Sequence, residues 1–378
     1  MNGRIASGGK MSTYMRLGSF NVQNLFQRAK ALNFQNHAKV DQVLAKIGEF
    51  QDLIAKSKYT ESDKQEIIRI YTGELSEYIE VRENRGKLFS RKGQKITGVK
   101  ANGKGDDWDG EVTFKPDTFG ELTRENTAHV IKDIHVDILC VVEVDDRPTL
   151  KSFDAQLLGS RYPYDLLIDG NDPRGIDVGL YSKYPIGTIR THMFDKDGKS
   201  VIFSRDCLEV EILLPNQKSL HILCNHFKSR GYDQNNTADK KRESQAKAVA
   251  RILETYDLEQ DWVVVAGDFN DNPESAPLQP LLTVPDLYNV LELQFKDDPM
   301  KRWTYHYDKF EQIDFILVST PLKDRFRSAG VERKGIYNLK NMTSSSNGMV
   351  PMEEEYSTVK KWADAASDHG AVWAEFNV

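Results

Sequence analysis

The chain has 378 residues, of which 39% are hydrophobic and 29% are charged. This composition is typical of globular proteins and allows one large domain or two smaller ones. The formal net charge of −6 excludes a general basic field that would attract nucleic acid. A nucleic-acid substrate would therefore need a local basic patch or a metal site. No apolar run approaches the roughly 20 residues of a membrane span, so we expect no membrane partner.

The N-terminal segment, residues 1–14, is polar and has no hydrophobic stretch of the kind found in signal peptides. We expect it to be disordered or vector-derived, with Met11 as the natural start. We expect a cytoplasmic protein, unless a signal peptide was removed before this numbering began. Cys140, Cys207 and Cys224 lie in apolar runs that resemble strands. Their odd number and spacing predict buried thiols in a reducing compartment, without a disulfide framework or a zinc site.

The first predicted strand leads through Asn21 into a polar turn, and a different pattern follows it. Taken alone, Asn21 is as readily a core amide bonded to backbone as a site residue. In residues 39–84 apolar side chains recur at the three-four spacing of two amphipathic helices, which predicts a helical hairpin. Plain packing most often explains such stripes. The alternative is cover by a second subunit, which predicts a homodimer through residues 39–84.

A basic stretch follows the predicted hairpin. It carries seven cationic side chains: Arg85, Lys87, Arg91, Lys92, Lys95, Lys100 and Lys104. A stretch of this kind is most often a solvated hairpin or a mobile loop. The functional alternative is an arm that contacts phosphate groups.

The rest of the chain places its polar residues at the ends of apolar strands. Glu143, for example, closes the buried run 137–144. An unpaired buried carboxylate costs several kcal/mol, and a bound cation would remove that cost. The candidate strand-end residues are Asn21, Glu143, Arg174, Asp177, His226, Lys228, Asp268, Asn270, Asp314, Asp368 and His369.

The sharpest of these strand ends lies in residues 262–273. A run of β-branched residues, typical of a strand buried on both faces, stops at Gly267 and is followed by Asp268-Phe269-Asn270. If the strand geometry persists, Asp268 and Asn270 point the same way and could hold a hydrated cation and a phosphoryl oxygen. For this stretch alone, a strand followed by an Asx-turn is the better interpretation. The other strand ends shift the balance toward a site.

The chemistry of the candidate set points to a hard cation. Carboxylate and amide oxygens suit Mg²⁺ or Mn²⁺ better than zinc, and no HExxH motif or multi-His cage is present. His226 and His369 are better suited to acid–base work or to contacting a phosphate. The set therefore predicts metal-assisted attack of water on a phosphate ester. P-loop, GxSxG and dinucleotide-binding fingerprints are absent.

Seven short motifs, in order, resemble those of the endonuclease/exonuclease/phosphatase superfamily, the DNase-like proteins. They are Ser19-Phe20-Asn21-Val22-Gln23-Asn24-Leu25, Val142-Glu143-Val144, Gly175-Ile176-Asp177-Val178-Gly179-Leu180-Tyr181-Ser182, Asn225-His226-Phe227-Lys228-Ser229, Gly267-Asp268-Phe269-Asn270, Gln312-Ile313-Asp314-Phe315-Ile316-Leu317 and Ser367-Asp368-His369. The resemblance implies a domain over residues 15–378, interrupted at 35–117 by the helical hairpin and the basic loop. It also implies an α/β fold: a four-layer α/β sandwich of two packed mixed β-sheets flanked by helices.

The resemblance further implies roles around a metal. Glu143 would be the principal metal ligand, helped by Asn21 and Asp368. Asp268 would orient or deprotonate the attacking water. Asn270 would hold a phosphate oxygen or the metal.

Other roles implied by the resemblance concern the phosphate. His369 would contact the scissile phosphate and Asp314 would orient His369. His226 would be a second phosphate-facing histidine, with Asp177 as its partner. Two further cationic residues would clamp the phosphate, namely Arg174 and Lys228.

The motif forms also bear on the branch of the superfamily. The inositol-phosphatase branch usually carries Tyr-Arg after its Gly-Asp-x-Asn, whereas this chain has Asp271-Asn272-Pro273. Its forms look most similar to bacterial nuclease-type members, which implies an endonuclease or exonuclease with nucleic acid, DNA favoured, as substrate. One alternative is a phosphomonoesterase or a lipid or inositol phosphodiesterase of the same superfamily. Another is a non-catalytic interaction protein that binds through the helical hairpin.

Overall fold

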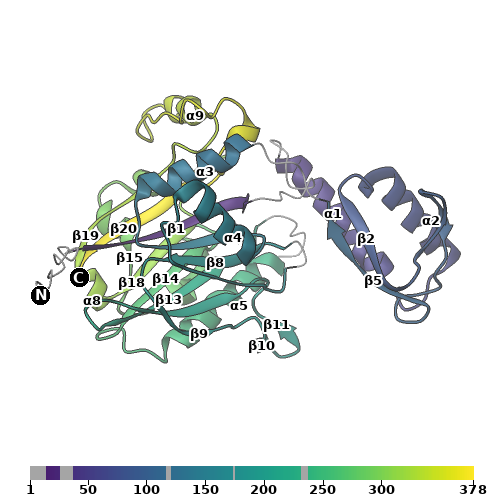
Figure 1. Ribbon diagram of the computed structural model, residues 1–378, viewed down its shortest axis with the longest axis horizontal. Helices are drawn as coiled ribbons and strands as arrows, with labels where there is room; N and C mark the ends of the chain where they lie inside the picture. Colours follow the sequence, from purple (N-terminus) through teal and green to yellow (C-terminus); the bar gives the residue numbers. More distant parts are fainter. Residues whose placement is uncertain (1–13, 26–36, 116–120, 173–174, 231–236) are drawn as a thin grey trace, which may run out of the picture.

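Two six-stranded mixed sheets form the centre of the protein in a computed structural model, which describes residues 14–25, 37–115, 121–172, 175–230 and 237–378 (Figure 1). The first sheet has the order β19-β20-β1-β6-β8-β7 and the second the order β15-β18-β14-β13-β12-β9. The strands of the first are β1 (Tyr14–Leu25), β6 (Ile138–Val144), β7 (Tyr164–Ile168), β8 (Asp177–Ser182), β19 (Phe326–Glu332) and β20 (Ala371–Asn377). Those of the second are β9 (Ile186–Arg190), β12 (Cys207–Leu213), β13 (Ser219–His226), β14 (Trp262–Asp268), β15 (Leu287–Asn289) and β18 (Asp314–Ser319).

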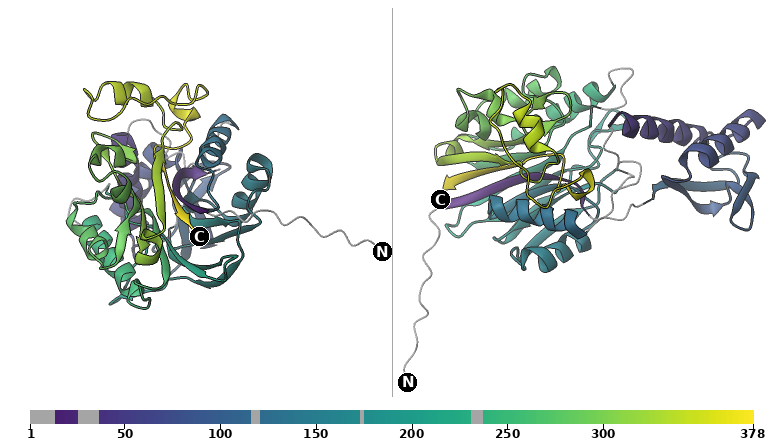
Figure 2. Two further views of the ribbon diagram at one scale, coloured as in Figure 1. Left: turned by 90° about the vertical axis from the view of Figure 1, so that its left-hand side faces the viewer. Right: turned by 90° about the horizontal axis from the view of Figure 1, so that it is seen from above.

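Helices cover the outer face of each sheet, which gives four layers (Figure 2, left). Apolar side chains of α3 (Glu121–Ile134) and α4 (Arg147–Phe153) pack on the first sheet. Those of α5 (Thr237–Leu253) and α6 (Gln279–Leu282) pack on the second. Shorter helices complete the body: α7 (Val290–Gln294), α8 (Thr320–Lys323) and α9 (Leu339–Ser344). The predicted α/β sandwich is confirmed.

The inner faces of the two sheets share one core. Val142 of the first sheet and Val264 of the second belong to the same buried cluster, whereas Val263 and Val265 face the helical layer. All seven residues of β14 are buried, because one face of the strand meets the opposite sheet and the other meets α5. The prediction of a strand buried on both faces is therefore confirmed. The three cysteines are free and buried, as predicted.

The chain connections bring several strand ends to one edge. Strands β1 and β6 are parallel and are connected through α3, and β13 and β14 are parallel and are connected through α5. Their carboxyl ends therefore meet at the same edge, where ligand sites of α/β proteins usually lie. The antiparallel strands β8, β18 and β20 begin at this edge.

A helical hairpin is not what residues 37–115 form. They form a small α+β unit, called the 37–115 subdomain below, to the right of the sandwich in Figure 1. Two helices and a π-helical turn (Tyr71–Leu75) pack with four strands in one apolar core. Its elements are α1 (His37–Ile54), α2 (Glu61–Ile70), β2 (Ile79–Gly86), β3 (Phe89–Lys92), β4 (Lys95–Val99) and β5 (Trp108–Phe114). Much of the predicted basic loop is thus the β3–β4 hairpin.

Specific contacts close this subdomain. The fully buried Trp108 donates its indole N–H to the Tyr59 hydroxyl at 2.8 Å, and Tyr59 donates to the Ile54 carbonyl at 2.6 Å. A Cβ on Gly103 would lie 1.9 Å from the Ser57 carbonyl oxygen, so only glycine fits there. Ile79, expected in the second helix, instead starts β2.

The apolar stripes of α1 and α2 are covered inside the subdomain. Ile47, Phe50 and Ile67 pack against Trp108 and other residues of its strands. These stripes therefore need no second subunit for cover, and dimerisation stays a prediction. Within the described ranges, no helix combines the length and apolarity needed to cross a membrane.

Candidate active site

Hydrogen-bonded neighbours in the second sheet bring three candidate residues into one row. His226, the last residue of β13, pairs with Asp268, the last residue of β14. Asp268 in turn pairs with Asp314, the first residue of β18. All three side chains are buried. The sequence spaces these residues widely, but the strand register places them side by side.

Asn21 connects this row to the first sheet. Its amide Nδ2 donates to Asp268 Oδ2 at 3.0 Å and to Glu143 Oε1 at 3.2 Å. Its side-chain oxygen Oδ1 accepts the backbone N–H of Gln23 at 2.9 Å. The candidate groups of both sheets therefore belong to one connected set.

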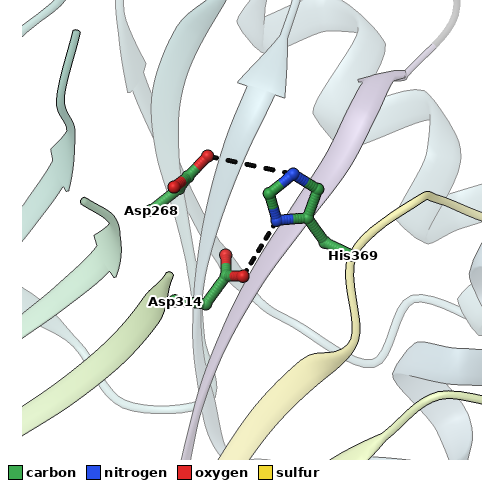
Figure 3. Close-up of side chains that lie close together, drawn as sticks. All are labelled: Asp268, Asp314 and His369. Carbon is green, nitrogen blue, oxygen red and sulfur yellow. Dashed lines mark hydrogen bonds and ion pairs between the residues drawn. The ribbon is translucent and has the colours of Figure 1, made fainter. Parts of the chain in front are cut away.

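His369 and Asp314 form a buried pair (Figure 3). His369 Nδ1 lies 2.8 Å from Asp314 Oδ2, and His369 Nε2 lies 4.0 Å from Asp268 Oδ2. Burial lowers the pKa of His369, but the charges of Asp314, Asp268 and Asp368 outweigh burial and hold this pKa well above its usual value. The geometry therefore favours a charged imidazolium that faces Asp268.

A second histidine also lies close to Asp268 Oδ2. His226 Nε2 is 3.7 Å from Asp268 Oδ2 and 3.8 Å from Glu143 Oε1. The site thus contains two imidazoles close to buried carboxylates, which is suitable for acid–base chemistry and for binding an anionic group.

The turn after β14 differs from the geometry expected if the strand had continued. Asn270 has a positive φ of 56°, so it no longer follows the strand. The backbone N–H of Asn270 donates to Asp268 Oδ1 at 2.7 Å, as in an Asx-turn. The Asn270 amide also donates to Asp268 Oδ2 at 3.0 Å and to the Phe227 carbonyl at 3.2 Å. The two interpretations of this stretch are therefore compatible, since the Asx-turn itself fixes the carboxylate of the site.

Gly267 allows β13 and β14 to approach each other just before the site. Its φ is 139°, and a Cβ there would lie 1.8 Å from the Asn225 carbonyl oxygen. No side chain fits at that distance, so the position requires glycine.

Several acidic groups share this small volume. Burial and the charge of Asp314 raise the pKa of Asp268 to about 7. Burial and the charge of Asp368 raise the pKa of Glu143. Because neighbouring buried carboxylates disfavour one another's ionisation, a cation among them would relieve the repulsion. One group whose atoms lie close enough to hold a metal is Asp268, Asp314 and His369.

For three candidate residues, the roles expected from the sequence stay predictions. Arg174 lies outside the described residues. Asp177 starts β8 and accepts the backbone N–H of Gly170 at 2.7 Å, and its pairing with His226 stays a prediction. Lys228 has its backbone held by Gln245 and Arg242, and a phosphate contact by its side chain stays a prediction.

Two residues of this region had no assigned role in the sequence interpretation. Ser367 donates its hydroxyl to the backbone carbonyl of Asn21 at 2.7 Å and accepts the His369 backbone N–H at 3.0 Å, so it fixes the loop before β20. The ring of Tyr305 lies 4.9 Å from that of His369, and the two backbones form a β-bridge. The Ser-Asp-His motif was a signal for Ser367. No motif in the sequence around Tyr305 predicts that it lies beside His369.

Comparisons with known proteins find a family profile and several solved structures that this chain resembles. The profile described as "Endonuclease/Exonuclease/phosphatase family" matches residues 116–369. No curated protein sequence matches the chain significantly. Among similar solved structures is an endonuclease/exonuclease/phosphatase family protein from Bacteroides thetaiotaomicron, with 13% identity over 96% of this chain and 97% of that one and a TM-score of 0.50.

Two further solved structures are TDP2 proteins. The truncated Caenorhabditis elegans TDP2 has 18% identity over 68% of this chain and 91% of that one, with a TM-score of 0.45. The D. rerio TDP2 complexed with single strand DNA product has 14% identity over 68% and 92%, with a TM-score of 0.47. The profile match spans more than half of the sequence. The chain therefore belongs to the endonuclease/exonuclease/phosphatase family of phosphoesterases.

Proposed function

We propose that the protein is a nuclease that hydrolyses phosphodiester bonds of nucleic acid, with DNA favoured, and that it requires Mg²⁺ or Mn²⁺. The observation that carries the proposal is the single connected set of Asn21, Glu143, Asp268, Asp314 and His369 at one edge of the two sheets. This set contains carboxylates, an amide and a charged imidazole. Such groups suit direct attack of water on a phosphate ester better than a covalent mechanism.

The metal fits best beside Glu143. Asn21 Nδ2 donates to Glu143 Oε1 at 3.2 Å, and burial and the charge of Asp368 raise the pKa of Glu143, which supports a cation beside these two carboxylates. We assign the ion to Glu143 and Asp368, with the side-chain oxygen Oδ1 of Asn21, which has a second lone pair, as a further ligand. In the alternative group around His369, Nδ1 is already held by Asp314, and we assign Nε2 to the phosphate. When bound, the ion would polarise the phosphate and neutralise charge that develops on it.

Asp268 is the group that handles the water. Asn21 and Asn270 donate hydrogen bonds to its carboxylate, which holds it in one orientation. A carboxyl with a pKa of about 7 accepts a proton readily near neutral pH. In this proposal Asp268 Oδ2 takes the proton of the attacking water.

His369 stabilises the phosphate. Asp314 holds its Nδ1, so Nε2 is left facing Asp268. In this proposal Nε2 also contacts the phosphoryl oxygens. His226 would be the second phosphate-facing imidazole, with Asp177 as its expected partner. Lys228, together with Arg174, completes the proposed phosphate contacts.

The nucleic-acid substrate rests on the motif forms Asn225-His226-Phe227-Lys228-Ser229 and Gly267-Asp268-Phe269-Asn270-Asp271, which look most similar to nuclease-type members. The same resemblance supports a domain over residues 15–378 with residues 35–117 as its insertion. A non-catalytic interaction protein is less well supported, because each candidate catalytic position carries a residue type that can perform its expected role. Light scattering of the full chain would test the proposed homodimer, and a monomeric mass would contradict it.

A substrate panel tests the function. We expect cleavage of plasmid and single-stranded DNA with Mg²⁺ or Mn²⁺ and none with EDTA. Asp268→Asn and His369→Ala should each lower the rate at least 100-fold while the thermal unfolding midpoint stays measurable and cooperative. Asp261→Asn is the matched control, because Asp261 precedes the opposite end of β14, roughly 20 Å from Asp268.

The panel also distinguishes the alternatives. Hydrolysis of sphingomyelin or inositol phosphates without any cleavage of DNA or RNA would select the lipid or inositol phosphodiesterase. Full DNA cleavage by either site variant would refute the proposed residues.

A further inference from the structure

The 37–115 subdomain has a strongly basic end on a protein that is acidic as a whole. Residues 86–100 carry five Lys or Arg side chains and no Asp or Glu, although the net charge of the chain is −6. From this and the arguments below we infer that the β3–β4 hairpin binds the phosphate backbone of nucleic acid outside the catalytic site. The inference rests on the proposed function, since it assumes a polymeric nucleic-acid substrate.

The subdomain presents these charges on an ordered hairpin. Leu88 and Phe89 are buried in its core, and the Tyr71 ring stacks on Phe89 at a centroid distance of 4.9 Å. From this anchor β3 runs outward and pairs with β4. The hairpin is therefore attached through apolar packing, and its backbone presents the cations on one ordered element.

The cations of the hairpin have few stabilising ion pairs with neighbouring carboxylates. Lys92 lies directly opposite Lys95 in the strand register, an arrangement of like charges that destabilises a hairpin. Within the described part of the chain, neither lysine has an ion pair, and both are exposed. Arg91 and Lys87 share one carboxylate, Glu83, at 3.9 and 3.2 Å. Folding does not require this accumulation of positive charge, which is the property expected of a surface that meets a polyanion.

The chain path places the subdomain at the edge that carries the site. It lies between β1, which carries Asn21 near its carboxyl end, and α3. Helix α3 returns to the start of β6, so α3 begins at the same edge of the sandwich as Asp268. Figure 1 shows the subdomain beyond the arrowhead of β1, on the side opposite the C-terminus. Phe114 and Glu121 are seven positions apart, which limits their separation to about 25 Å.

The chemistry favours a long polyanion over a small phosphate ester. A small ester would be contained by the groups around Asp268 and would not reach β3 and β4. A strand of nucleic acid carries one phosphate every few ångströms, so it can occupy the site and the hairpin together. Such a second contact would raise the affinity for substrate without changing the chemistry.

Binding at several salt concentrations tests the inference. The probe is a fluorescent 30-nucleotide single-stranded DNA, measured by anisotropy on full-length Asp268→Asn protein so that the probe is not cut. We compare this parent with a protein that also carries Arg91→Ala, Lys92→Ala and Lys95→Ala. Loss of three contacts should flatten the slope of log K against log salt by about 2 and weaken binding more than tenfold at 100 mM salt.

A matched triple variant controls for the loss of net charge. Lys218→Ala, Lys323→Ala and Arg327→Ala remove the same charge at the opposite edge, where β13 and β19 begin and β18 ends. This control should keep the parent slope. Lys92→Glu alone should weaken binding further than Lys92→Ala, which guards against an effect of side-chain truncation.

The possible outcomes separate the inference from the proposed function. If the active protein cleaves DNA but the hairpin triple variant keeps the parent slope, the inference is wrong and the nuclease function stands. If the active protein cleaves no nucleic acid, the proposed function fails by itself. Hairpin-dependent binding to phosphatidylserine vesicles with unchanged DNA binding would also overturn the inference, in favour of a membrane surface.

Discussion

Replacing Asp314 with Asn removes the charge of the buried pair, because the side chain keeps its shape and its oxygen can still accept from His369 Nδ1. The same change lowers the pKa of Asp268, which shifts the pH dependence of activity in the same direction as the change at His369 does. Both residues are buried, with exposed fractions of 0% and 7%. At the observed 2.8 Å, the Coulomb attraction is about 6 kcal/mol at an effective dielectric constant of 20. Desolvation opposes part of this attraction, so losing the partner of a buried charge costs roughly 3–5 kcal/mol.

If the charge on His369 stabilises the phosphate in the transition state, this loss lowers kcat/KM. A penalty of about 3–5 kcal/mol corresponds to roughly a 150- to 5,000-fold decrease. The assay is cleavage of a fluorescent oligonucleotide with saturating Mn²⁺. The control is Asp133→Asn, which removes a carboxylate that binds Lys334 and Tyr356 on the helical layer.

The pH dependence gives a second readout. Asp314 raises the pKa of His369, so the variant imidazole loses its proton at a lower pH than the parent imidazole does. The ratio of variant to parent activity should therefore fall as the pH rises from about 5.5 to 8. A variant within threefold of the parent at neutral pH, or a ratio that is constant with pH, would refute the assigned role of the pair.

Two stability predictions follow from single residues. Gly267→Ala should lower the thermal unfolding midpoint by several degrees and abolish activity, because its Cβ would lie 1.8 Å from the Asn225 carbonyl oxygen; unchanged stability would show that β13 and β14 separate easily. Burial raises the pKa of Glu209, but hydrogen bonds from His192, Tyr256 and Arg190 outweigh it and lower this pKa from 4.5 to about 2. Glu209 therefore contributes stability above about pH 4.5 that is lost as the pH falls toward 2, so Glu209→Gln should lower the free energy of unfolding in urea at pH 6 and lose this difference near pH 2. A difference that is constant with pH would contradict this.

Local sequence determined much of the sandwich. The β-branched run before Gly267 indicates a strand buried on both faces, because consecutive apolar side chains point alternately to the two faces. The Gly-Asp-x-Asn motif likewise marks the end of that strand. Polar residues at strand ends then predict a site, since buried strands of α/β proteins carry ligands at their carboxyl ends.

Only the tertiary structure decided how these ends meet. Asn21 and Asp268 are 247 positions apart, yet they are joined by a 3.0 Å hydrogen bond. Such a contact depends on the packing of two sheets, and no periodicity within either segment encodes it. The placement of Tyr305 against His369 has the same origin.

The 37–115 subdomain shows what helical periodicity could not predict. Periodicity correctly indicated apolar stripes in α1 and α2, but it did not reveal what covers them. Strands β2 and β5, with Trp108 at the centre of the core, supply that cover. A helical pattern specifies which face of a helix is buried, whereas the residues that cover this face are distant in sequence. Here strands cover both helices, so the segment forms a small folded unit and not the expected helical hairpin.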